Sequence, residues 1–200
     1  MSETIRRLRQ DHANLSRLLA ALERQVIAME GGEWVDWDIV RRIVEYCLAY
    51  PDLHHHPLED LVLARLQNKE PVIATPFIGL VTDHQELSAS LRRVAAAIEQ
   101  VLQDATVPRD WFIRVVRKFL STQRDHTRRE ELEFYPAAEG ALGAADWADL
   151  DRSASRLPDD PLFSRPTSRQ YLALLSDIKA GEAAELRGSK PDRSRFDNQP

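Results

Sequence analysis

Apolar residues recur every three or four positions between about Thr4 and Met29, which is the spacing of one face of an α-helix. Two glycines at 31–32 follow this stretch, and glycine at such a place ends helices. The pattern therefore predicts a first long helix, with His12 lying on its apolar stripe. The other positions of that stripe are Ile5, Leu8, Leu15, Leu19, Leu22 and Val26.

A second helical pattern begins near Asp36 and continues through Val40, Ile43, Val44, Cys47 and Leu48. Pro51 is expected to kink or break it near Tyr50, because proline lacks an N–H and clashes with the preceding turn. A new helical segment is predicted from about Asp52 to Gln67, with Pro57 at or just past its first turn. The face of that segment carries His55, Glu59, Val62 and Leu66.

Two further long patterns complete the helical part of the chain. The third is predicted to start at Thr75, as an N-cap, followed by Pro76. The fourth is predicted to start near Val107 and Pro108 and to end around Pro136. Their apolar stripes contain Leu80, His84, Leu87, Leu91, Val94, Ile98 and Val101 in the third, and Phe112, Val115, Phe119, His126, Glu130 and Phe134 in the fourth.

Four helices with one apolar stripe each predict an all-α fold, an up-down-up-down four-helix bundle over residues 1–140. Residues 141–180 are expected to form a helical extension packed on the bundle. Its short helices would span 146–156, anchored by Trp147 and Leu150, and 167–179, anchored by Tyr171, Leu174 and Leu175. Residues 181–200 are polar and are predicted to be a disordered tail.

Composition limits the classes of function. A chain of 200 residues that is 43% hydrophobic suits one globular domain with a core. The net charge of −5 argues against a nucleic-acid partner. No apolar run approaches the ~18 residues of a membrane span, and no apolar segment stands at the start, so we expect no membrane association and a cytoplasmic location. The single cysteine, Cys47, rules out an intramolecular disulfide and a cysteine-rich metal motif. A homodimer stays open.

Candidate chemistry lies on the apolar stripes themselves. His12, His84 and His126 each interrupt the stripe of a different helix. Any one of them alone would be interpreted as a core histidine with a polar neighbour. Three that point into one core are more easily explained by a shared metal, because unpartnered buried imidazoles are costly. His126 and Glu130 are four residues apart, as are His55 and Glu59, so each pair shares a helix face.

The register of the segment HHHPLED is ambiguous, since His56 and Asp60 have the same spacing as His55 and Glu59. We expect only one pair to face the core, and the stripe of Val62 and Leu66 favours His55 and Glu59. His54 and His56 are then flanking residues, solvated or outside the ligand set. Three acids directly precede a core histidine and are interpreted as solvent-facing or inter-helix residues, namely Asp11, Asp83 and Asp125.

Six candidate ligands exceed the four of a structural zinc site and suit two metal ions. They are His12, His55, Glu59, His84, His126 and Glu130. Imidazole and carboxylate ligands without sulfur suit iron, with zinc or manganese as alternatives. Ferritin-like sites use Glu-x-x-His and are rich in carboxylates, so the present spacing disfavours that class.

In order and helical placement, four short segments resemble the hemerythrin-like, HHE cation-binding family. They are RQDH at 9–12, HHPLED at 55–60, TDHQE at 82–86 and DHTRREELEFYP at 125–136. The resemblance covers roughly residues 3–140 and implies a non-heme centre of two iron ions with bridging carboxylates. It places the family's ligands on the six residues above. Oxygen-carrying hemerythrins use five histidines, whereas only four lie on these stripes, so water, His54, His56 or a nearby Tyr or Glu is left to complete the coordination.

The resemblance implies a protein that interacts with oxygen, peroxide or nitric oxide, in binding, sensing or iron handling. Two alternatives stay open: an enzyme that decomposes peroxide with two iron ions, and a helical interaction module with a structural metal. Catalytic residues cannot be named from the sequence, because no acid or base near the metals is singled out.

Overall fold

The computed structural model describes residues 2–103, 107–164, 166 and 168–188. The first helix, α1 (Glu3–Gly31), begins where the Ser2 hydroxyl accepts a hydrogen bond from the Ile5 N–H at 3.1 Å. It ends at Gly32, whose φ of 75° lies in the left-handed region that favours glycine. The predicted helix and its glycine stop are therefore confirmed.

The second column of helix changes its winding near Tyr50, where a kink or break was predicted. α2 (Trp37–Ala49), capped by the Asp36 carboxylate, passes into one π-turn, η1 (Pro51–His55), and then into α3 (His56–Lys69). In η1 the His56 N–H bonds to the carbonyl of Pro51, five residues back. The kink or break predicted near Tyr50 is therefore confirmed in the form of a π-turn: α2 ends at Ala49, and Pro51, which lacks an N–H, takes the first position of η1.

The third column begins later than predicted. α4 (Pro71–Ala74) and a 3₁₀ turn, η2 (Thr75–Phe77), precede α5 (Leu80–Leu102). Thr75 is not the N-cap of the long helix, because its hydroxyl donates to the carbonyl of Pro71 at 3.0 Å. The two prolines at 71 and 76 divide this corner into short turns before α5 starts.

The fourth column runs beyond its predicted end. α6 (Arg109–Arg129) starts after Pro108, as predicted, and passes through a second π-turn, η3 (Glu130–Phe134), into α7 (Tyr135–Ala141). The Tyr135 N–H bonds to the carbonyl of Glu130, again five residues back. Pro136 therefore follows a widened turn and does not end the helix.

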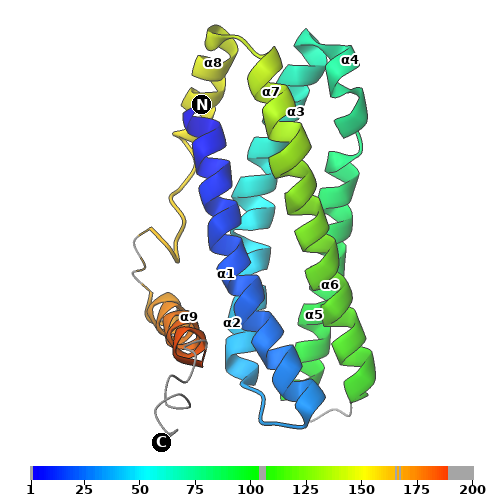
Figure 1. The fold of residues 1–200 in the computed structure, drawn as a ribbon, viewed down its shortest axis with the longest axis vertical. Helices are drawn as coiled ribbons and strands as arrows, with labels where there is room; N and C mark the ends of the chain where they lie inside the picture. The colour runs from blue at the N-terminus through cyan, green and yellow to red at the C-terminus, as the bar shows by residue number, and fades with distance from the viewer. Residues whose placement is uncertain (1, 104–106, 165, 167, 189–200) are drawn as a thin grey trace, which may run out of the picture.

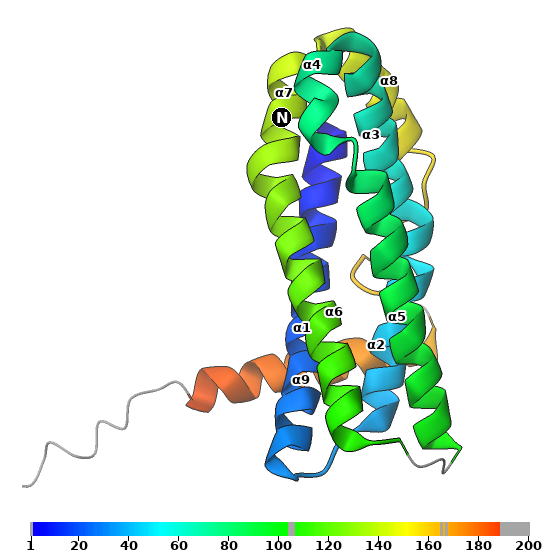
Figure 2. The ribbon, with the colours of Figure 1, turned by 90° about the vertical axis from the view of Figure 1, so that its right-hand side faces the viewer.

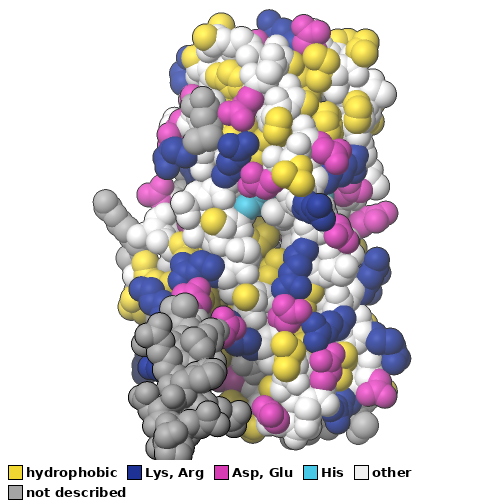
Figure 3. Space-filling view, in the orientation of Figure 1, with side chains coloured by type: hydrophobic (Ala, Val, Ile, Leu, Met, Phe, Trp, Pro, Cys, Tyr) yellow, Lys and Arg dark blue, Asp and Glu magenta, His cyan; other side chains and the backbone are white. Residues whose placement is uncertain are grey.

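These columns lie side by side along the long axis, and each runs antiparallel to the one before it (Figures 1 and 2). α1 and α5 each contact both α2 and α6. The predicted all-helical class is confirmed, with no strand in the described ranges. None of the helices described combines the length and apolar character needed to cross a membrane. On the face in Figure 3, basic and acidic side chains are interspersed. Arg117 on α6 and Glu23 on α1 form an ion pair between helices, at 2.7 Å.

The core consists of two apolar clusters with a polar layer between them. One cluster joins the C-terminal half of α1 to α2, α5 and α6, and the other joins the start of α1 to α3, α7 and α8 (Ala144–Ala154). On α1 the boundary falls between Leu8 and Leu15, and on α5 it falls between Leu80 and Leu87. His12 and His84 lie at these two boundaries, so both α1 and α5 contribute a histidine to the polar layer.

The C-terminal extension packs on the outside of the columns, through α8 and α9 (Arg169–Gly188). α8 contacts α1 and α3, and α9 lies crosswise against α1 and α2 (Figure 2). Leu150 and Leu174 are buried, while Trp147 and Tyr171 pack partly buried against the two clusters.

The prediction of disorder from residue 181 is wrong for residues 181–188, which continue α9. Two carboxylates of this stretch pair with α1: Glu182 with Arg17 at 2.7 Å, and Glu185 with Arg24 at 2.9 Å. These ion pairs, and the helix-favouring alanines of the segment, explain why a polar stretch without an apolar stripe is helical. Residues 189–200 of the predicted tail lie outside the described residues.

Replacing Gly32 with alanine should destabilise the metal-free protein by about 1 kcal/mol, because a side chain raises the energy of a left-handed residue. Gly140→Ala is the matched control. Gly140 is exposed near the end of α7 with no heavy atom within 4 Å of an added Cβ, so alanine there should stabilise by about 0.5 kcal/mol. Urea unfolding measures both; equal effects would contradict the role of Gly32 as a helix stop.

Candidate metal centre

The six residues predicted as ligands come together in the polar layer. They arrive from all the long columns: α1, the η1–α3 junction, α5 and the α6–η3 junction. All are buried, with exposed fractions of 7% or less. They are His12, His55, Glu59, His84, His126 and Glu130.

Two carboxylates lie at the middle of this cluster. Glu59 Oε2 is 3.4 Å from His55 Nε2 and 3.3 Å from His84 Nε2. Glu130 Oε1 is 2.9 Å from His126 Nε2 and 3.3 Å from His84 Nε2. The other oxygen of Glu130 is 3.4 Å from His12 Nε2. Each carboxylate thus faces imidazoles from more than one helix.

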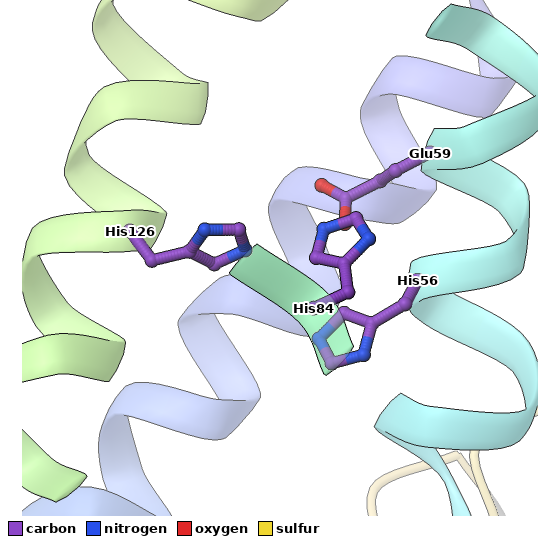
Figure 4. Close-up of side chains that lie close together, drawn as sticks. All are labelled: His56, Glu59, His84 and His126. Atoms are coloured by element: carbon purple, nitrogen blue, oxygen red, sulfur yellow. The ribbon is translucent and has the colours of Figure 1, made fainter. Parts of the chain in front are cut away.

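His56 also lies in the cluster, so the expectation that it is a flanking residue outside the core is wrong. It is 6% exposed, and its ring stacks on His84 with centroids 4.3 Å apart. Figure 4 shows His56, Glu59, His84 and His126 directed toward one another. One ligand atom from each of these four lies within 4.8 Å of the others, and Glu59 also belongs to a second such group with His12 and His55.

The π-turn explains why two adjacent histidines face inward. A wider turn rotates successive residues through a smaller angle, so His55 at its end and His56 at the start of α3 are both buried. The register of the acids is as predicted: Glu59 is 1% exposed, whereas the side chain of Asp60 is 38% exposed. The prolines at 51 and 57, on either side of this segment, are the sequence signal that could have indicated a distorted turn.

A second set of carboxylates contacts four of the imidazoles on the ring nitrogen that faces away from Glu59 and Glu130. Their Nδ1 atoms face acids on neighbouring helices or turns, as metal-binding histidines usually do. The pairs are His12 with Glu131 at 2.9 Å, His55 with Asp11 at 3.3 Å, His56 with Asp52 at 3.5 Å, and His84 with Asp60 at 3.1 Å. Of the acids that precede a core histidine, Asp11 is thus an inter-helix residue. Asp83 pairs with Arg129 at 3.1 Å, and Asp125 is exposed.

Tyr135, which sequence patterns did not single out, is fully buried against the cluster. Its hydroxyl donates to Glu59 Oε1 at 2.5 Å and lies 3.4 Å from His12 Nε2. Burial raises the pKa of Tyr135 well above its ordinary value, so the hydroxyl keeps its proton and stays a donor. The second π-turn, η3, brings this side chain to the inside.

The pKa values of the buried histidines and carboxylates show that the two carboxylates favour positively charged neighbours. Burial lowers the pKa of His12 and of His84, but nearby carboxylates outweigh burial and raise these pKa values to about 10 and about 11. For His55, burial dominates and lowers the pKa to about 3. Burial also acts to raise the pKa of Glu130, yet His12 and His126 hold it well below its ordinary value. Two imidazolium protons thus balance two buried carboxylates.

The residues fit metal ions. In the described part of the chain, Oε2 of Glu59, Oε2 of Glu130 and Nδ1 of His126 are buried without a hydrogen-bond partner. Such atoms are expensive unless a cation or donor meets them. Imidazole nitrogens and carboxylate oxygens suit iron, manganese or zinc. Cys47 is outside the cluster, and burial raises the pKa of its thiol to about 12.

Comparison with known proteins agrees with this geometry. The family model of the hemerythrin HHE cation binding domain matches residues 3–138, a range that contains every residue of the cluster. Neither the curated proteins nor the solved structures include a match to the chain.

Replacing His56 with alanine should lower the metal content or affinity of the protein, because its ring lies within ligand distance of Glu59, His84 and His126. His54→Ala is the matched control: His54 is half-buried and packs near the Tyr50 ring at 5.5 Å, outside the cluster. Metal analysis after dialysis measures both. Equal metal retention in the two variants would exclude His56 from the ligand set.

Proposed function

The chain belongs to the hemerythrin HHE cation-binding family, and on that premise we propose that it holds a non-heme centre of two iron ions that interacts with oxygen, peroxide or nitric oxide. The observation that carries the proposal is the sharing of Glu59 between two groups of potential ligands: His56, His84 and His126 in one, His12 and His55 in the other. A carboxylate between two groups is what a bridged pair of ions requires.

The proposed domain organisation follows the same reasoning. Residues 1–140 would form a four-helix bundle of hemerythrin type, in up-down-up-down order, and residues 141–180 an extension packed on it. The ligands would be His12, His55, His56, Glu59, His84, His126 and Glu130. His56 supplies a fifth histidine, which the apolar stripes alone did not provide.

The chain's own groups account for how such a centre is held. Glu131, Asp11, Asp52 and Asp60 fix the rings of four histidines through Nδ1, which leaves Nε2 directed inward. Tyr135 fixes Glu59 by its hydrogen bond. The apolar clusters on both sides exclude bulk water. Iron bound there would supply redox chemistry toward small oxidants and nitric oxide.

Protein loaded with iron under anaerobic conditions should contain two metal ions per chain, as a bridged pair requires. Glu59→Gln should lose at least one of them, because it removes the shared carboxylate. Asp60→Asn removes a carboxylate one residue along, outside the centre, and should keep both ions with about 10–100-fold weaker affinity. Metal analysis with a chelator titration decides: one ion in the unaltered chain, or an empty site in Asp60→Asn only, would sink the proposal.

Azide or nitric oxide should change the near-ultraviolet and visible spectrum of the iron-loaded protein, and peroxide should either bind stoichiometrically or be turned over. The reason is that seven side chains cannot fill the twelve positions of two six-coordinate ions, even with two bridging carboxylates. Sustained peroxide consumption would favour the enzyme, and stoichiometric binding a carrier or sensor. If none of the three ligands changes the spectrum, the proposal is wrong and the metal has a structural role.

A further inference from the structure

One histidine of the cluster lacks the outer support that the other four have. His12, His55, His56 and His84 each have a carboxylate at Nδ1, whereas Nδ1 of His126 is buried with no hydrogen-bond partner among the described residues. The side chain of His126 is 4% exposed, and only its Nε2 meets a carboxylate, that of Glu130. The ring of His126 is therefore the least constrained of the five.

The same histidine is one of the residues that line a surface groove between α5 and α6, the two helices seen side by side in Figure 2. The groove measures about 290 Å³ and is lined by three carboxylates, those of Asp83, Glu86 and Asp125. Two cations also line it, but Arg129 is held by Asp83 at 3.1 Å and by the carbonyl of Pro76 at 2.6 Å. Lys118 is the other cation, so the groove has a net negative charge.

We propose that this groove is the path by which a divalent cation reaches the centre, docking between Glu86 and Asp125 and passing first to His126. The proposal rests on the proposed metal-binding function and adds a second, transient cation site to it. A ligand that receives an ion from solvent must be able to turn, and His126 is the ring without an outer carboxylate. Carboxylates at a groove mouth attract cations and raise their rate of association.

Two other cavities near the cluster are less suitable for a hydrated cation. The one beside Tyr50 and Asp11 contains no histidine of the cluster in its lining, so it stops at an outer carboxylate. The one beside His56 is lined by apolar side chains together with Asp52, Ser88 and Gln123, but it measures only about 10 Å³. That volume holds about one water molecule, so a hydrated ion does not fit there. The α5–α6 groove combines solvent access with a ligand of the centre.

Stopped-flow uptake of Co²⁺ by the metal-free full chain tests the path. The variant Glu86→Gln with Asp125→Asn should take up Co²⁺ at least about three-fold more slowly at low ionic strength, with the same final content. The difference should shrink in high salt, because the effect is electrostatic. The matched control, Glu3→Gln with Asp159→Asn, removes two carboxylates that line the cavity beside Tyr50 and should load at the unaltered rate.

The possible outcomes distinguish a failure of the proposed entry path from a failure of the proposed metal-binding function. If the unaltered chain binds no Co²⁺ or Fe²⁺, the proposed function fails and the path fails with it. If the chain loads but the groove variant loads at the unaltered rate, only the path is overturned. Slower loading in the control pair alone would place the path beside Tyr50 and would also overturn the proposal.

A second variant tests the freedom of His126. Thr122 lines the groove one helical turn before His126, so Thr122→Glu would offer Nδ1 the carboxylate that the other histidines have. Loss of Co²⁺ to an excess of chelator should then become several-fold slower, with the bound Co²⁺ per chain unchanged. Release at the unaltered rate would show that His126 is not the ligand through which the ion passes.

Discussion

Two carboxylates buried in the middle of an apolar interior set the conditions for the rest of this structure. Glu59 and Glu130 are 1% and 0% exposed, and an uncompensated buried carboxylate costs several kcal/mol. Every long column therefore contributes an imidazole that faces them, and the apolar core divides into a cluster on each side. Protons on His12 and His84 balance the two charges, but two carboxylate oxygens still lack a hydrogen bond. The fold thus holds a pair of acids in a form that a bound cation stabilises.

Each of the two π-turns lies just before a proline, at a place where the column also carries candidate ligands. Each π-turn is followed within two residues by a proline inside the helix, Pro57 in one column and Pro136 in the other. In a regular α-helix the proline ring clashes with the carbonyl four residues back, and a widened turn moves that carbonyl away. The same widening brings an extra side chain inward, His56 in the first column and Tyr135 in the second. Both side chains touch the carboxylate pair or its histidines, consistent with the frequent occurrence of π-turns at functional sites.

Much of this could be predicted from the sequence, because burial imposes a helical period on apolar residues. Asp36, Gly32 and Pro108 mark real helix boundaries, and helical phase separates Glu59 from Asp60. The missed features are those where the period changes or where the cause lies on another helix. A constant period cannot place two adjacent histidines in the core, so the helical pattern alone predicts His56 to lie outside it. The outer carboxylates Asp11, Asp60 and Glu131 are recognised only when the columns are packed together, as are the ion pairs that hold α9 on α1.

The segment beyond the family match is connected to the centre by an unbroken series of contacts. Arg7 donates to the carbonyls of Ala154 and Pro158 in the extension, and also to the Tyr50 hydroxyl at 3.3 Å. That hydroxyl donates to Asp11 at 3.4 Å, and Asp11 lies 3.3 Å from His55 Nδ1. The orientation of His55 therefore depends on a helix and loop that follow residue 138. Asp151 and Asp160 reinforce this link by bonding Thr4 and Asn14 on either side of Arg7 on α1. Because α1 carries both His12 and the acid that orients His55, holding α1 in place holds one of the two ligand groups as a unit.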